Sequence, residues 1–307
     1  MEKSKVYFSK VISSESLIKV YKALDANLTG KIAVKVSTGE RGAKGYLKAD
    51  LIGPLVRDIK GTIVECNTAY NGARNTTADH LEVAKEHDFT EFADVDIMDA
   101  NGEMKLPVKN GRHLKYDLVG KNLENYDSLL NLAHGKGHPM GGFGANLKNQ
   151  AIGLASRNGK AYIHMCGDSE SPEEMIERLT FEDDGRIHDG KTLQKDFIES
   201  MAEAVMAVND YLFEHHKPVA YITVMNAISL LCDCAAEQDD PIMCDLGIVA
   251  SLDPVANDQA FVDFIWQSNE QGAAELRREI ERQEGMHILE YAEELGLGSR
   301  EYELIEV

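Results

Sequence analysis

Two cysteines one residue apart, Cys232 and Cys234, are the most chemically suggestive feature of this sequence. They follow a largely apolar run, 220–231, in a chain with five cysteines. Neighbours this close seldom form a disulfide with each other, because the bridge would be badly strained. They could hold one soft metal ion, serve in redox chemistry or simply pack. Asp233 between them disfavours simple packing, because an unpaired carboxylate is costly to bury.

A second unusual segment, 134–144, holds two histidines and one lysine among five glycines. Glycine at this density lets the backbone approach a ligand closely. We interpret the segment as a ligand or metal loop, with His138 and Lys136 as the reaching side chains; the alternative is a tight turn with incidental histidines. It lacks the Gly-Lys-Ser/Thr ending of a phosphate-binding P-loop. The residues expected to contact a ligand are Gly137, Gly141, Gly142, Asn67 and Asn149.

The segment 134–144 lies between a predicted strand, Tyr126–Leu132, and a predicted helix, Ala145–Ser156. The order strand, glycine-rich loop, helix presents backbone N–H groups and a helix dipole to an anion. Lys148, near the start of that helix, and Lys136 are therefore candidates for anion anchors or for a catalytic base.

His164 and Cys166 follow a strand-like stretch, 161–163. Two residues apart on an extended segment, they would point to the same side, and either could be a metal ligand. The alternative is a half-buried strand end. Together with His138, Cys232 and Cys234, His164 completes the set of candidate metal ligands. Imidazole and thiolate donors suit zinc, iron or nickel, so a divalent transition metal is a candidate cofactor, although the sequence does not identify one.

The remaining candidates have structural interpretations. Cys66 and Cys244 are expected to pack. Asp253 precedes Pro254 and is expected to cap a helix that begins there. Asp258, about one turn later, could reach a site or be solvated.

Strand and helix patterns alternate along both halves of the chain, which predicts an α/β fold with a mixed, largely parallel sheet and helices on both faces. The expected strands are 5–11, 31–36, 62–66, 95–98, 126–132, 219–225 and 246–251. The expected helices are 15–24 with Ser14 as its N-cap, 50–59, 77–87, 145–156, 191–215, 254–266 and 273–295.

We expect one composite domain over residues 1–307, built from two closely packed halves, 1–164 and 191–307. The segment 165–190 is strongly acidic and is expected to form a peripheral, solvated helix and turn. Because the carboxyl ends of parallel strands share one edge of a sheet, the segment 134–144, the cysteine pair and His164 should meet there.

The composition limits the function. A formal net charge of −20 argues against nucleic acid or an anionic membrane as a partner and favours a small molecule or a metal ion. The N-terminus has no apolar core of the signal-peptide kind, and no long apolar run suggests a membrane span. An odd number of cysteines without framework spacing is typical of reduced thiols, so a cytoplasmic location is expected.

Several long segments resemble the family called domain of unknown function 362. They are 136–149, 153–160, 232–234, 245–256 and 295–303. Members are often labelled iron–sulfur-centre proteins, and many carry a ferredoxin-like insert after the stretch that matches His164. Here the corresponding region, 165–200, contains Cys166 alone. We therefore expect no ferredoxin-type four-iron cluster. The resemblance implies that His138, Lys148, His164 and the cysteine pair follow the family pattern.

Three functions are consistent with these features. The first is a metal- or small-ligand-binding protein with a composite site of histidine, cysteine and lysine, and this class includes enzymes. The second is a redox or electron-transfer accessory protein, the role implied by cluster-bearing relatives. The third is a non-catalytic interaction protein.

Overall fold

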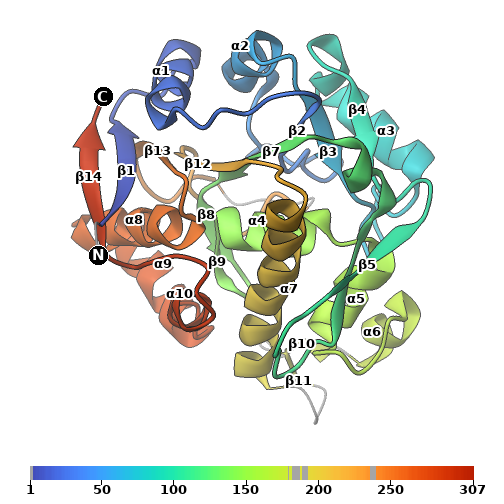
Figure 1. The fold of residues 1–307 in the computed structure, drawn as a ribbon. Coiled ribbons are helices and arrows are strands. Elements are labelled where there is room, and N and C mark those ends of the chain that lie inside the picture. Colours follow the sequence, from blue (N-terminus) through green and yellow to red (C-terminus); the bar gives the residue numbers. More distant parts are fainter. Residues whose placement is uncertain (1–2, 179, 182–186, 189–192, 236–239) are drawn as a thin grey trace.

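The structure is a computed structural model that describes residues 3–178, 180–181, 187–188, 193–235 and 240–307. Within these residues, eight strands form one mixed sheet in the order β14-β1-β13-β12-β7-β2-β3-β4 (Figure 1). Strand β13 runs antiparallel to β1 and β12, whereas all other neighbours are parallel. The bounds are β1 (Ser4–Ser9), β2 (Ile32–Lys35), β3 (Thr62–Glu65), β4 (Val95–Ile97), β7 (Ser128–His134), β12 (Val219–Met225), β13 (Gly247–Ser251) and β14 (Tyr302–Glu306).

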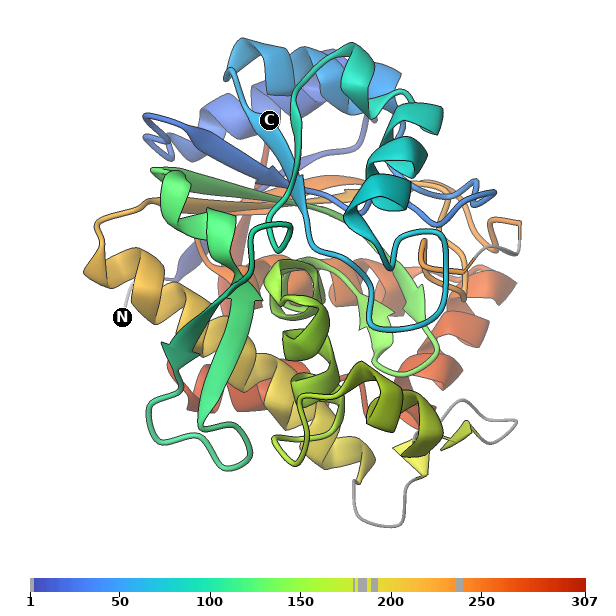
Figure 2. The same cartoon turned by 90° about the vertical axis from the view of Figure 1, so that its right-hand side faces the viewer.

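Helices cover both faces of this sheet (Figures 1 and 2). On one side lie α1 (Ser14–Leu24) and α2 (Ala49–Asp58), and on the other α4 (Asn146–Leu154) and α8 (Pro254–Gln267). Strand β7 shows why: Leu130 and Leu132 join the core beneath α1 and α2, whereas Leu129 joins the core on the opposite face. The predicted α/β fold with a mixed, largely parallel sheet is thus confirmed.

The remaining helices surround these layers. They are α3 (Thr77–Glu86), α5 (Arg157–His164), α6 (Pro172–Arg178), α7 (Gln194–Glu214), α9 (Gln271–Arg282), α10 (His287–Glu294) and the short 3-10 helices η1 (Phe89–Glu91) and η2 (Lys121–Asn125). In the described part of the chain, no helix combines the length and apolar character that a membrane crossing requires.

Among the described residues, three small strand pairs lie outside the main sheet. They are β5 (Glu103–Pro107) with β6 (Tyr116–Gly120), β8 (Lys136–His138) with β9 (Gly142–Gly144), and β10 (Thr180–Phe181) with β11 (Ile187–His188). The sequence analysis did not predict β5, β6 or β14. It treated 134–144 as a loop, whereas most of that segment is the β8–β9 hairpin.

Three local predictions were wrong. The stretch 161–163 lies in helix α5 and not in a strand, because Ser156 caps a helix by accepting the N–H of Gly159 at 3.0 Å. The predicted helix 273–295 is two helices, α9 and α10, separated where Glu284 adopts the left-handed conformation at φ 54°. Ser13, not Ser14, caps α1.

The acidic segment 165–190 is only partly described. It contains α6 and the β10–β11 pair, while residues 179, 182–186 and 189–190 lie outside the described residues. Residues 191 and 192 of the predicted helix 191–215 also lie outside, and α7 is described from Gln194.

Helix α4 is fixed to α8 through a buried carboxylate. Asp258 is fully buried and accepts the backbone N–H groups of Asn146 and Leu147 at 2.9 and 2.8 Å. The helix N-terminus that we expected to face an external anion is therefore capped by a carboxyl group of the protein itself. The predicted cap Asp253 is confirmed: it accepts from Val255 and Ala256, both at 2.9 Å.

We expect Asp258→Ala to lower the free energy of unfolding by about 2–4 kcal/mol, because two buried N–H groups lose their acceptor. Urea denaturation followed by circular dichroism measures this. Asp258→Asn keeps one acceptor oxygen and should fall between the two proteins. Asp58→Ala, at an exposed position in α2, is the matched control and should change stability little. A loss no larger than that of the control would show that Asp258 does not hold α4.

Candidate functional site

A cavity of about 400 Å³ opens at the carboxyl ends of the central parallel strands. Lys35 at the end of β2, Glu65 at the end of β3 and His134 at the end of β7 all line it, as do residues 232–234 after β12. Strands β2 and β7 are neighbours, and from them the chain proceeds outward in opposite directions. Such a reversal of strand order is where open α/β sheets place their ligands.

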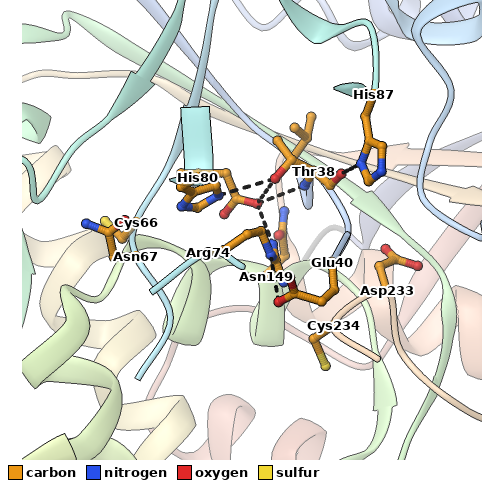
Figure 3. Close-up of polar contacts among 12 residues, drawn as sticks. Thr38, Glu40, Cys66, Asn67, Arg74, His80, His87, Asn149, Asp233 and Cys234 are labelled. Atoms are coloured by element: carbon orange, nitrogen blue, oxygen red, sulfur yellow. Dashed lines mark hydrogen bonds and ion pairs between the residues drawn. The ribbon is translucent and has the colours of Figure 1, made fainter. Parts of the chain in front are cut away.

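A network of buried charges forms one wall. The ammonium of Lys35 lies 2.9 Å from Glu65, and the guanidinium of Arg74 lies 3.4 Å from Glu65 and 3.5 Å from Glu40. Glu65 also accepts the N–H of Thr38 at 2.8 Å. Burial raises the pKa of Glu65, but Lys35 and Arg74 outweigh it and lower that pKa to about 2. Figure 3 shows Arg74 and Glu40 between the Thr38 segment and Cys234.

Asp233 anchors the opposite wall. It is buried, with His134 Nδ1 at 2.9 Å and the ammonium of Lys136 at 2.8 Å from its carboxylate oxygens. His134 Nε2 lies 2.6 Å from the carbonyl of Asn226, so each ring nitrogen faces an oxygen. These cations hold the pKa of Asp233 far below its usual value, although burial alone would raise it. The sequence suggested that burying Asp233 would be costly, and its contacts with Lys136 and His134 offset that cost.

Lys148 is a lining cation that has neither a carboxylate nor a hydrogen-bond acceptor among the described residues. Its side chain rises from the first turn of α4 and lines the cavity. Within the described residues its ammonium makes no ion pair or hydrogen bond, whereas Lys35, Arg74 and Lys136 each face a carboxylate. Burial, together with Lys136 and Lys35, lowers the pKa of Lys148 to about 7.

Across the lining, basic residues exceed acidic ones. Five lysine and arginine side chains line the cavity, against the two carboxylates of Glu65 and Asp233. Lys160 is the fifth cation, and its ammonium donates to the carbonyls of Ala155 at 2.6 Å and Cys66 at 3.4 Å. A protein with a net charge of −20 therefore encloses a cationic cavity.

His138 is placed at the end of β8 with its ring fixed by the turn that follows. Its Nδ1 accepts the backbone N–H groups of Met140 at 3.2 Å and Gly141 at 3.0 Å. Because Nδ1 acts as an acceptor, the proton of the neutral ring must be on Nε2. Burial and the nearby Lys148 lower the pKa of His138 well below its ordinary value, so the ring is neutral.

His164 has the opposite arrangement. It lies at the end of α5, where its Nδ1 is 2.6 Å from the carbonyl oxygen of Lys160. Nδ1 must donate there, so Nε2 carries the lone pair. Burial is the largest cause that lowers the pKa of His164 to about 4. His138 and His164 line the same cavity but present different chemistry to it.

Cys232 and Cys234 are joined by a disulfide, contrary to the expectation that such close neighbours would not bond. Their Cα atoms are 5.2 Å apart, within the range that a disulfide spans. The two sulfurs and a ring nitrogen of His138 all lie within 4.8 Å of one another. The segment 134–144 and the cysteine pair therefore meet in space, and His164 lines the cavity without joining that group of three.

Four of the five residues expected to contact a ligand have structural roles. Gly137 allows the hairpin to approach Leu230, where a Cβ would lie 2.5 Å from the carbonyl oxygen. Gly142, at φ +75°, packs against Ile280 of α9, and Gly141 donates to His138. Asn67 donates to Thr77.

Asn149 does line the cavity and links α4 to the sheet. Its side chain donates to the carbonyl of Lys35 at 3.1 Å and to Asn131 at 2.7 Å. The side-chain amide oxygen of Asn149 accepts a hydrogen bond from the ammonium of Lys35 at 3.1 Å.

The other cysteines lie apart from this pair. Cys66 is buried, as expected, and packs near Leu154. Cys244 is exposed, so its expected packing was wrong; it follows Pro241 in a surface segment beside Glu270. Cys166 is partly buried after the end of α5 and does not line the cavity.

The sequence analysis missed Lys35, Glu65, Arg74 and Lys160. A signal was available for the first two: each is a charged residue that ends a short apolar strand, so each had to be buried with a partner. Arg74 and Lys160 come from a loop and a helix, and their positions depend on tertiary packing.

The model of the family described as domain of unknown function (DUF362) matches residues 32–263. The chain belongs to this family. A comparison with curated proteins finds no match.

Two solved structures share limited similarity with this DUF362 protein. The lactate racemase apoprotein from Thermoanaerobacterium thermosaccharolyticum is 14% identical with a TM-score of 0.47, and the match covers 86% of this chain and 57% of that one. A protein from Thermotoga maritima is 12% identical with a TM-score of 0.43, covering 84% and 59%. The chain thus spans less than two thirds of either protein.

The Glu65 pairs predict a specific acid sensitivity. A carboxylate whose folded pKa lies below its unfolded value stabilises the protein above the unfolded pKa, and this stability is lost as pH falls. For Glu65 the window runs from about pH 4.5 down to about pH 2. The shift corresponds to at most ~3 kcal/mol, part of which is offset because burial lowers the pKa of Lys35.

We therefore expect Glu65→Gln to be less stable than wild type at pH 7 and to lose less stability between pH 5 and pH 3. Chemical denaturation at several pH values measures both. Glu82→Gln, at an exposed position in α3, should follow the wild-type pH curve. If the free energy of unfolding depends on pH in the same way for wild type and Glu65→Gln, Glu65 is not the source of the acid sensitivity.

Proposed function

We propose that this protein binds a small carboxylate in the cavity and transfers a proton on it, as an acid–base enzyme. The observation that carries the proposal is the set of three side chains facing one enclosed space: an uncompensated lysine, a histidine with a free lone pair and a histidine with a free N–H. The sequence analysis left open whether the protein is an enzyme.

Lys148 supplies the anion site. A lysine whose pKa is lowered to about 7 carries only part of its charge near neutral pH. An anion beside it restores the full charge, so binding is coupled to uptake of a proton. Because Lys148 is buried, this attraction is stronger than that of a surface pair.

His164 and His138 supply complementary proton chemistry. The Nε2 of His164 can accept a proton from the carbon next to a carboxylate or carbonyl group. The Nε2–H of His138 can donate to an oxygen on which negative charge develops. Both rings are neutral when the cavity is empty, and a bound anion raises the basicity of His164 by stabilising its protonated form.

A cytoplasmic location, expected from the sequence, is part of the proposal. In a reducing compartment the Cys232–Cys234 pair would be held largely as thiols.

Lys148→Met should weaken binding of malonate, used as a small carboxylate probe, by about tenfold or more, since a charge-assisted contact is lost. Isothermal titration calorimetry measures this. The affinity of wild type should fall as pH rises above about 7, while that of Lys148→Met should not change. Lys22→Met, at a surface position, is the matched control. Equal affinities for wild type and Lys148→Met would remove the anion site from the proposal.

Proton transfer is tested by exchange of carbon-bound hydrogen. We expect the protein to speed the exchange of the methyl protons of pyruvate, used as a 2-oxo acid probe, for deuterium in D₂O, followed by proton NMR. His164→Gln removes the base and should reduce this rate by about 10²-fold or more. His215→Gln, at an exposed position, should retain it. If no 2-oxo or 2-hydroxy acid in a panel exchanges faster than in buffer, proton transfer is not the function.

A second candidate function, binding of a transition metal, is favoured by the proximity of His138, Cys232 and Cys234. Two features oppose it in this form of the protein. The sulfurs are bonded to each other, and His138 Nδ1 already accepts two N–H groups, which leaves a proton on Nε2 where a metal would bind. The donor set fits a metal only after reduction and a change of tautomer.

Metal analysis of reduced protein decides this second function. If the protein binds a transition metal at this site, anaerobically reduced wild type should retain about one zinc, iron or nickel ion per chain after gel filtration. One ion is expected because the three residues form one site. Cys232→Ser and Cys234→Ser should retain none while melting near the wild-type temperature. Equal metal content in all three proteins would place the metal elsewhere.

A further inference from the structure

The Cys232–Cys234 disulfide contributes little to the stability of the fold. It closes a loop around one residue, so it removes little entropy from the unfolded chain. The segment is already fixed by Asp233, through its ion pairs and through its carbonyl, which accepts the N–H of Glu40 at 2.8 Å. Both sulfur-bearing residues nevertheless line the cavity.

The two sulfurs are not equivalent. Cys232 is 2% exposed, and its Sγ accepts the backbone N–H of Cys234 at 3.3 Å. Cys234 is partly exposed and is the more accessible of the two. In thiol–disulfide exchange the accessible sulfur is attacked and the other departs as a thiolate. The N–H donor identifies Cys232 as the sulfur whose negative charge is stabilised.

We propose that the cavity is also a thiol–disulfide exchange site for small anionic thiols, with Cys234 as the sulfur attacked and Cys232 as the leaving group. This chemistry goes beyond the proton transfer proposed above and does not depend on either histidine. It uses the same cavity and the same excess of positive charge.

The exchange balances in two steps. The thiolate of the incoming compound attacks Cys234 Sγ to form a mixed disulfide, and the electron pair of the broken bond leaves with Cys232 Sγ. A second molecule of the thiol then attacks the sulfur of the bound compound, which releases the symmetric small disulfide. Two thiols are oxidised, the protein disulfide takes up two electrons, and the protons of the two thiols end on the two cysteines.

The cavity determines which thiols are accepted. A volume of about 400 Å³ admits a small molecule and excludes a protein partner. Lys148 and the excess of cationic lining residues attract a compound that carries a carboxylate besides its thiol.

The first test compares two thiols of similar size on folded, full-length protein. Mercaptoacetate carries a carboxylate and mercaptoethanol does not. Reduction is stopped by alkylation, and peptide mass spectrometry measures modification of Cys232 and Cys234 separately from that of Cys66, Cys166 and Cys244. Rates are divided by those measured with a small free disulfide, so that intrinsic thiol reactivity cancels.

We expect the corrected rate with mercaptoacetate to exceed that with mercaptoethanol by about tenfold or more. Lys148→Met should reduce this preference toward unity, and Lys22→Met should preserve it. A wild-type preference of unity overturns the proposal, as does a disulfide that neither thiol reduces without denaturant. The thiol comparison does not measure proton transfer from carbon. The exchange proposal can therefore fail while the deuterium-exchange test succeeds, and the deuterium-exchange test can fail while the exchange proposal holds.

The second test identifies the attacked sulfur. With the symmetric disulfide of mercaptoacetate, Cys232→Ser should accumulate a mixed disulfide at Cys234, located by peptide mass spectrometry so that an adduct at the exposed Cys244 is counted separately. Cys234→Ser should form the adduct at Cys232 at least about tenfold more slowly, because that sulfur is buried. Equal rates, or faster reaction at Cys232, overturn the assignment of roles. Thermal melts of both variants confirm that folded protein is compared.

Discussion

Burying charge at the carboxyl edge of the sheet is the constraint on which the rest of the site depends. A buried ammonium or guanidinium is tolerated only when a carboxylate or several carbonyl groups compensate it. Glu65 serves Lys35 and Arg74, and Asp233 serves Lys136 and His134. Each acid thus ties together segments that are far apart in the sequence, and the cavity keeps its shape because these pairs cannot separate without exposing a bare charge.

Among the described residues, the same ion pairs leave Lys148 without a carboxylate partner. The acids of the network are already engaged by other cations, so Lys148 has no counterion of its own. A fold could have avoided this cost with a neutral residue on α4. The same helix uses Asp258 to satisfy its N-terminal N–H groups, so the missing counterion near Lys148 is not due to a general lack of buried acids on this side of the sheet. In the proposed function, the bound carboxylate would supply the negative partner of this charge.

The sequence predicted the sheet and most of the layers because they depend on local patterns. Short apolar strands such as 62–66 and amphipathic helices such as 15–24 are recognisable without tertiary information. Helix α5 was mistaken for a strand because 161–163 is apolar and short, a pattern that both structures share. The proximity of His138 to the cysteine pair was also foreseeable, since both follow parallel strands. The ion network was not, because Arg74 and Lys160 reach the cavity from a loop and a helix whose positions only packing determines.

The two histidines show most clearly what residue type alone does not determine. His138 and His164 are the same residue, line the same cavity and are both held neutral by burial. Their roles differ because one Nδ1 meets backbone N–H groups in a hairpin turn and the other meets a carbonyl in the last turn of a helix. Backbone geometry therefore assigns the proton to opposite positions on the two rings. A donor and an acceptor produced in this way can act on one substrate, whereas two identical tautomers would offer only half of that chemistry.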